Sequence, residues 1–150
     1  MQHIKYIVLA VFLLCMSNKS TAQSSIPQKI YLFGMSASFN DSIVYFTHIQ
    51  ELPDAYINTK SKFLENRGAY SDQLRNYLRT RGSQTPTCIT CYAFDRKTIE
   101  KKYEKLRANY IDKANIPYEI RYVKDDEFHF TSVPIYVNTS ETAAKGKKGK

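Results

Sequence analysis

Residues 28–50, QKIYLFGMSASFNDSIVYFTHIQ, contain two apolar runs in which the side chains alternate with a period of two. This period places successive side chains on opposite faces of a β-strand. Asn40 and Asp41 separate the runs, and both side chains can bond to the nearby main chain in a tight turn. The stretch therefore predicts a β-hairpin, and its largely apolar faces predict that both sides are covered.

Small side chains end the first run, at Gly34, Ser36, Ala37 and Ser38. They leave room for a helix or another part of the sheet to approach closely. His48 lies among apolar residues of the second run, and we interpret it as a core histidine rather than a catalytic base. Pro53 follows, and we expect it to end the strand because proline has no N–H for a ladder.

Residues 59–81 predict a helix in two pieces. Thr59 or Ser61 is expected to cap a short first turn, and Gly68 is expected to interrupt it. Ser71 is the predicted N-cap of the second piece, with Asp72 in its first turn. The second piece has an apolar stripe at a spacing of three and four, formed by Leu74, Tyr77 and Leu78. Gly82 is its predicted stop.

Thr87 to Phe94 predict a buried strand, and Asp95 is the predicted cap of the following helix. One face of that helix carries apolar residues at helical spacing, Ile99, Tyr103, Leu106 and Tyr110. Asn115 and Pro117 are expected to end it. Tyr118 to Val123 predict another strand, followed by an acidic turn at residues 125–127 and a short run at 128–133 that can form a final strand.

These elements predict an α/β fold in a single domain. We expect a mixed four- to five-stranded sheet, built as an N-terminal β-hairpin followed by β-α-β-α-β, with the helices packed on it. The strand–helix–strand connections are expected to place parallel strands next to each other. The composition, with 43% hydrophobic and 24% charged residues, excludes collagen-like, low-complexity and wholly disordered chains.

The N-terminal stretch has the features of a secretory signal peptide over residues 1–22. Lys5 precedes an unbroken apolar run at 7–16, and Ser20 and Ala22 place small residues before a cut at Gln23. The run is too short for an ordinary membrane anchor, so we expect no transmembrane span in the mature chain. The alternative is a buried N-terminal helix. Residues 23–139 then form the domain, and 140–150 form a disordered Lys-rich tail.

The net charge of +8 raises the question of an anionic partner. The candidate anion-binding surface consists of two helix residues and four tail lysines, Arg75, Arg79, Lys145, Lys147, Lys148 and Lys150. It could attract an anionic envelope polymer or phospholipid head groups. The alternative is an ordinary solvated helix face. Because much of the charge lies in the tail, we expect no specific nucleic-acid binding.

Three stretches carry a resemblance to known proteins: KIYLFGMSASFNDSIVYFTHIQE, YSDQLRNYLRTRG and FDRKTIEKKYEKL. The chain resembles a family of small exported bacterial proteins of unknown function over most of residues 28–131. The resemblance implies export and a single α/β domain, and it implies no reaction.

Cys88 and Cys91 would be the two cysteines of the mature chain, spaced C-x-x-C in an oxidising compartment. Three interpretations remain open: structural thiols, a local disulfide in an irregular segment, or a redox pair. A redox pair normally starts a helix, whereas these residues lie within a predicted strand. Residues three apart on a regular strand point to opposite faces, which does not close a disulfide.

A second candidate group, Asp125, Asp126 and His129, could hold a cation or act in acid–base chemistry. The alternative is a solvated turn followed by a strand residue. We expect no metal site and no cofactor. The sequence therefore predicts an exported, periplasmic or extracellular protein that binds an envelope protein or an anionic envelope polymer without catalysis. The alternatives are a thiol–disulfide protein using Cys88 and Cys91, or a small hydrolase with an acidic site.

Overall fold

The computed structural model describes residues 25–38, 42–114 and 117–135. The described residues form five strands, which make one mixed sheet, and two helices. In chain order these are β1 (Ser25–Ala37), β2 (Ile43–Thr47), β3 (Gln50–Asn58), α2 (Arg67–Thr80), β4 (Thr87–Ala93), α3 (Arg96–Ile111) and β5 (Glu119–Val123). The predicted single α/β domain with a mixed sheet is confirmed.

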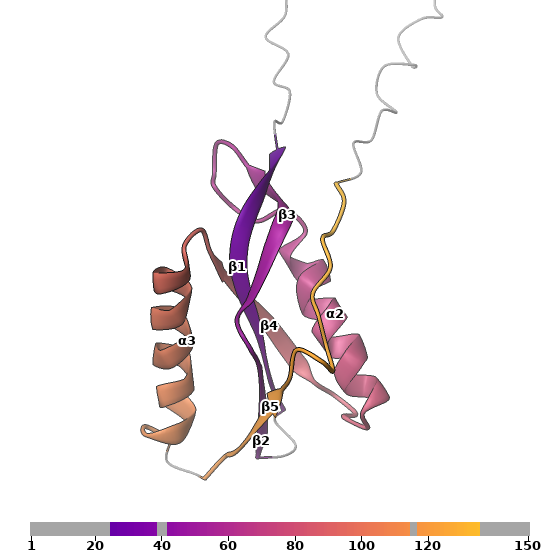
Figure 1. Cartoon of the computed structure of the whole chain (residues 1–150). Coiled ribbons are helices and arrows are strands. Elements are labelled where there is room, and N and C mark those ends of the chain that lie inside the picture. Colours follow the sequence, from indigo (N-terminus) through magenta and orange to yellow (C-terminus); the bar gives the residue numbers. More distant parts are fainter. Residues whose placement is uncertain (1–24, 39–41, 115–116, 136–150) are drawn as a thin grey trace, which may run out of the picture.

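The long strand β1 is the centre of the sheet (Figure 1). On one edge it pairs antiparallel first with β3 and then with β2, so β2 and β3 act as one interrupted strand. The predicted hairpin is therefore confirmed, although Asn40 and Asp41 lie outside the described residues. On its other edge β1 pairs antiparallel with β4, and β5 lies parallel to β2.

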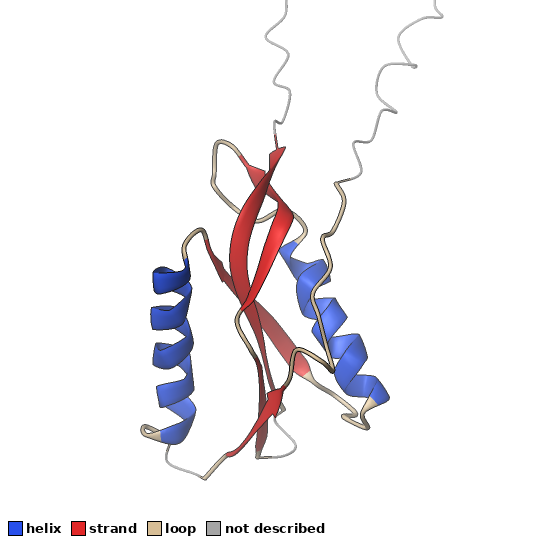
Figure 2. Ribbon diagram, viewed as in Figure 1, coloured by secondary structure: helices blue, strands red, loops and turns tan. Residues whose placement is uncertain are grey.

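The two helices cover opposite faces of the sheet, so the domain has three layers (Figure 2). Even-numbered residues of β1 such as Ile30 and Leu32 pack with α2, and odd-numbered residues such as Phe33 and Met35 pack with α3. The two apolar faces of the hairpin are thus both buried, as the period-two pattern predicts. The predicted apolar face of α3 packs in the second layer, with the ring of Tyr103 edge-on to Phe33 at a centroid distance of 4.9 Å.

Gly34 lets α2 approach the sheet closely, as the small residues at the end of the first run predict. A Cβ on Gly34 would lie 2.6 Å from Cδ2 of Leu74 and 3.0 Å from Cζ of Phe130. The Gly34 N–H donates to the side-chain hydroxyl of Thr47 at 2.9 Å, where β2 gives way to β3. The packing therefore favours glycine, since a side chain at this position would force Leu74 and Phe130 to move.

Pro53 does not end the second strand, contrary to the prediction. β3 continues through it to Asn58. The pairs Ile30–Leu52 and Gln28–Ala55 flank a register shift, so Pro53 and one further residue lie opposite Lys29 alone. A bulge of this kind tolerates proline because it leaves a residue outside the ladder.

The prediction of a two-piece helix over residues 59–81 is also wrong. The helix α2 is a single piece that begins at Arg67, includes Gly68 and has Asn66 as its N-cap residue. Ser71 is buried inside the helix, where its hydroxyl lies 3.0 Å from that of Thr90 on β4, so it is not a cap. The position of Ser71 is set by its packing against β4 and not by the preference of serine for helix N-caps.

Two other predicted boundaries are confirmed. The carboxylate of Asp95 accepts a hydrogen bond from the Thr98 N–H at 2.8 Å and so caps α3. Gly82 follows α2 with φ at +92°, the conformation that favours glycine after a helix. The predicted end of α3 differs from the observed one: the helix ends at Ile111, before Pro117, and Asn115 lies outside the described residues.

The expected side-by-side placement of parallel strands is wrong for both helical connections. β3 and β4 are separated by β1, and β4 and β5 are separated by β1 and β2. Each helix therefore crosses over at least one intervening strand. The hairpin causes this order, because β2 and β3 occupy one edge of β1 before α2 is reached. β4 then pairs on the other edge of β1, and β5 adds beside β2.

Residues 128–133 do not form the final strand that the sequence allows. Their backbone N–H and C=O groups form hydrogen bonds with side chains instead of with a neighbouring strand. The amide of Gln50 donates to the Phe128 carbonyl at 2.8 Å and accepts from the Phe130 N–H at 2.9 Å. Gln73 donates to and accepts from the backbone of Thr131 in the same way, with each bond at 2.9 Å. The segment runs beside α2 (Figure 1), with Phe128 and Phe130 buried in the core.

Within the described residues, no helix combines the length and apolarity needed to cross a membrane. The predicted signal peptide and Lys-rich tail fall outside the described residues, so both stay predictions.

Candidate functional site

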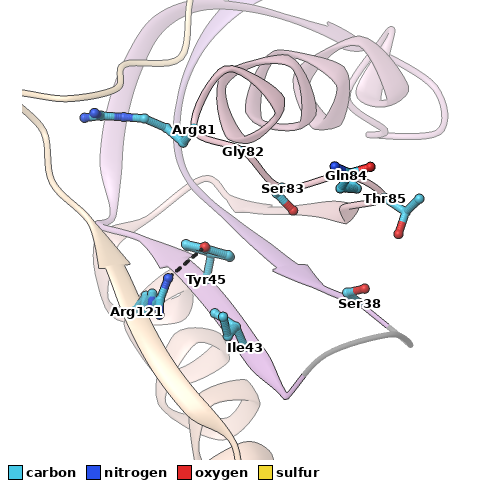
Figure 3. A pocket seen from close by; sticks show the side chains of 9 residues that line it. All are labelled: Ser38, Ile43, Tyr45, Arg81, Gly82, Ser83, Gln84, Thr85 and Arg121. Carbon is cyan, nitrogen blue, oxygen red and sulfur yellow. Dashed lines mark hydrogen bonds between the residues drawn. The ribbon is translucent and has the colours of Figure 1, made fainter.

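A hollow of about 520 Å³ opens beside the C-terminal end of α2 (Figure 3). Residues from the ends of β1 and β2, from the loop after α2 and from β5 line it: Ser38, Ile43, Tyr45, Arg81, Gly82, Ser83, Gln84, Thr85 and Arg121. Its volume is in the range of small-molecule sites. We call this hollow the Arg121 pocket.

Arg121 lines one side of the pocket, where its half-exposed side chain is oriented by two neighbours. Its register partner on β2 is Tyr45, whose hydroxyl accepts a hydrogen bond from Nη1 at 3.4 Å. Glu119, two residues earlier on the same face of β5, accepts from Nε at 2.7 Å. The bond to Glu119, reinforced by Tyr45, raises the pKa of Arg121, so the guanidinium stays charged. These two bonds orient the guanidinium, and Nη2 forms no hydrogen bond with the residues that the structure describes.

Arg81 lies at the rim, but its side chain points away from the hollow (Figure 3). Its Nη2 contacts Oε1 of Glu127 at 3.0 Å, and its Nε donates to the hydroxyl of Tyr77 at 3.2 Å. Arg81 therefore ties the acidic turn to α2. Arg121 is the guanidinium that lines the pocket, and its ion pair with Glu119 partly compensates its charge.

The wall opposite Arg121 is the loop after α2, and its backbone is fixed by the helix end. The Ser83 N–H bonds to the Leu78 carbonyl at 3.0 Å and the Gly82 N–H bonds to the Arg79 carbonyl at 3.1 Å. These two bonds form a Schellman motif, which ends a helix with glycine in the left-handed region. The loop presents the polar side chains of Ser83, Gln84 and Thr85 to the hollow (Figure 3).

The chemistry of the pocket suits binding of an anion that carries hydroxyl groups. None of the described residues that line it is a carboxylate. A guanidinium offers planar donors that match carboxylate and phosphate oxygens. Hydroxyl and amide groups around it can both donate and accept, as recognition of hydroxyls requires.

The helix arginines singled out from the sequence lie on α2 beside β4, not in the pocket. Arg75 pairs with Asp72, one turn earlier, so its charge is locally compensated. Arg79 is exposed, and its charge favours the thiolate of Cys88. The four tail lysines lie outside the described residues.

The cysteines lie on β4 as predicted, and on opposite faces of the sheet. Cys88 is buried on the α2 face and Cys91 packs on the α3 face, and both are free thiols. Burial removes solvent from both thiols, and this loss of solvation raises the pKa of each. A reactive thiol requires a lowered pKa and access, so the structure gives the redox interpretation no support.

The acidic group does not converge with His129. His129 is exposed between two buried phenylalanines, and Asp126 is exposed in the turn. Asp125 instead lies 3.7 Å from Nδ1 of His48 and accepts from the amide of Gln50 at 3.1 Å. His48 is exposed in the break between β2 and β3, so its interpretation as a core histidine is wrong. Neither histidine lines the Arg121 pocket.

Sequence reasoning missed Tyr45 and Arg121 as site residues. The alternation along residues 119–123 does place Glu119 and Arg121 on one face of a strand. Their meeting with Tyr45 depends on β5 lying beside β2, which no local pattern reveals. The signal would have been a polar pair facing outward on a strand that is otherwise apolar.

The chain matches no protein-family model, and no curated protein or solved structure is similar enough to count as a match. The resemblance to small exported proteins therefore stays an expectation, and the site is interpreted from its own geometry.

Proposed function

We propose that this protein is a non-catalytic binding protein of the bacterial cell envelope, and that it takes an acidic glycan in the Arg121 pocket. One observation carries the proposal: the Arg121 guanidinium is oriented by Glu119 and Tyr45 at the side of a hollow lined by hydroxyl and amide side chains. A guanidinium oriented in this way loses little side-chain freedom when it binds an acid.

The ligand class follows from the groups around the guanidinium. Nη2 of Arg121 can donate to a uronate or phosphate oxygen. The loop residues Ser83 and Gln84 lie across the hollow, where they can bond to sugar hydroxyls. An acidic sugar presents both kinds of group within one ring.

The envelope location rests on the N-terminal sequence, where Lys5 and the apolar run at 7–16 support export. The tail lysines support the same ligand class, because they add long-range attraction for a polyanion. This attraction is screened over about 8 Å at physiological salt, so it raises the rate of encounter more than it determines specificity.

The test is calorimetric titration of the purified chain with an oligogalacturonate and with its methyl ester. We expect the acid to bind, its affinity to fall with added salt, and the ester to bind at least about tenfold more weakly because one charge-assisted bond is missing. Equal binding of acid and ester, or binding of neither, would contradict the proposal.

A further inference from the structure

A second hollow, of about 360 Å³, lies at the other end of the helices, where α2 and α3 begin on either side of β4. Its lining combines aromatic rings with two cations: Phe63, Arg67, Tyr92, Ala93, Phe94, Asp95, Thr98 and Lys102. Two of these rings project into solvent, since Phe63 is 70% exposed and Phe94 is 40% exposed. We call this surface the Tyr92 pocket.

Tyr92 is the rigid centre of the surface. Its hydroxyl donates to the carbonyl of Lys62 at 3.2 Å and accepts from the N–H of Leu64 at 3.0 Å. Its ring meets that of Phe94 edge-on, at a centroid distance of 6.1 Å. Tyr92 and Phe94 are therefore already in contact before any partner arrives, which lowers the entropy cost of binding.

Two cations flank the rings, and each keeps donors for a ligand. Nε of Arg67 donates to the Thr90 carbonyl at 3.0 Å, and Nζ of Lys102 donates to the Tyr92 carbonyl at 2.8 Å. Within the described residues, the two terminal nitrogens of Arg67 form no other bond. Asp95 also lines the pocket and its carboxylate caps α3, but the two cations outnumber it, so the lining carries a net positive charge.

The same two bonds prevent another strand from pairing with the outer edge of β4. Thr90 and Tyr92 point their carbonyls away from β1, at the edge where an added strand would pair. Arg67 and Lys102 occupy these carbonyls, and Thr90 is completely buried. Charged side chains on an edge are a known protection against strand addition. A partner is therefore recognised here through side chains and not through its main chain.

We propose that the Tyr92 pocket docks an acidic segment of a partner protein, in which a carboxylate stands next to an aromatic or aliphatic side chain. The carboxylate binds between Arg67 and Lys102, and the apolar side chain lies against Phe63 and Phe94. Exposed aromatic rings beside arginine are typical of the residues that dominate protein–protein interfaces. A small ligand would leave the outer face of Phe63 in water, whereas a protein partner covers it.

The test is fluorescence anisotropy with three labelled peptides of glycine and serine that differ only in a central pair. The pairs are glutamate–phenylalanine, glutamine–phenylalanine and glutamate–alanine. The first is expected to bind at least about tenfold more tightly than the other two, since each of those lacks one of the two recognised groups. Equal binding of all three would overturn the proposal, as would equally effective competition by free 3-phenylpropionate.

Matched variants locate the binding. Phe63→Ser changes a side chain that is mostly in water, so the fold is retained, and it is expected to weaken the first peptide about tenfold. Ile111→Ser removes another exposed apolar side chain, 47% exposed on α3, and is expected to change nothing. Arg121→Gln is also expected to leave peptide binding unchanged, so this proposal and the proposed glycan binding can fail separately. Unchanged binding by Phe63→Ser, or self-association through this surface in sedimentation without peptide, would overturn the proposal.

Discussion

Tyr45 and Arg121 are register partners on the parallel strands β2 and β5, and the tyrosine hydroxyl accepts a hydrogen bond from the guanidinium at 3.4 Å. A related pair lies on the opposite face of the sheet, where Nε of Arg107 donates to the hydroxyl of Tyr122 at 2.8 Å. Each arginine also has a glutamate partner, Glu119 or Glu104. Of the two pairs, the Tyr45–Arg121 pair lines the Arg121 pocket. Substituting each arginine in turn therefore distinguishes an effect on binding in the pocket from the general effect of losing an arginine–tyrosine pair.

Gly34→Ala is expected to destabilise the domain by about 1–3 kcal/mol, because the added Cβ overlaps the side chain of Leu74. Denaturant unfolding followed by circular dichroism measures the change. Gly68→Ala is the matched control, since a Cβ there meets nothing within 4 Å and lies in a helix. It is expected to stabilise by about 0.5–1 kcal/mol. Equal effects of both variants would show that α2 does not approach β1 as described.

Gln50→Ala is expected to release the segment at residues 124–135. The substitution leaves the buried Phe128 carbonyl and Phe130 N–H without their side-chain partner, at a cost of about 1–3 kcal/mol for each group. Hydrogen exchange should show loss of protection at the Phe130 amide. Gln73→Ala, which removes three more exposed bonds to Thr131, is expected to have a smaller effect. An unprotected Phe130 amide in the wild-type protein would refute this role of Gln50.

The two cysteines are expected to remain free thiols of low reactivity. Alkylation of the folded protein at pH 8 should be slow, and slower at Cys88, which is 6% exposed, than at the half-buried Cys91. Both should react fully in denaturant. Mass spectrometry counts the modified groups, and a protein lighter by two hydrogens that resists alkylation in denaturant would show a disulfide instead.

The stability of the domain is expected to fall at alkaline pH, in part through Tyr103. Burial against Phe33 and Phe46 raises the pKa of Tyr103 from 10.0 to about 12. The folded state then holds the proton more tightly than the unfolded state, so its contribution is complete below pH 10 and is lost as the pH rises through about 12. Tyr103→Phe keeps the ring and removes the titration. Its denaturation midpoint should fall less steeply between these pH values than that of the wild type.

Where a local rule acts without competition, the sequence predicts the fold well. Asp95 caps α3 and Gly82 follows α2 because each depends on residues within one turn. The period-two pattern of residues 28–50 predicts a strand buried on both faces, since the alternation itself describes those faces. The class of the fold follows from these elements.

Distant contacts explain what the sequence could not predict. Pro53 was expected to end a strand, but a bulge opposite Lys29 accommodates it. Ser71 has the preference of a cap, yet its hydroxyl meets Thr90 on β4. Gln50 holds a segment far along the chain, at Phe128 and Phe130, and no spacing indicates such a pair. The Tyr45–Arg121 contact escaped prediction for the same reason.

Binding of the oligogalacturonate to Arg121→Gln and to Arg107→Gln is the most direct test of the proposed function. Both substitutions remove one positive charge and one arginine–tyrosine hydrogen bond, so the two variants match in net charge and in the type of hydrogen bond removed. We predict that Arg121→Gln weakens binding at least about tenfold, the value of one charge-assisted hydrogen bond, and that Arg107→Gln binds as the wild type does. Equal affinities of the two variants would contradict the assignment of the site to the Arg121 pocket.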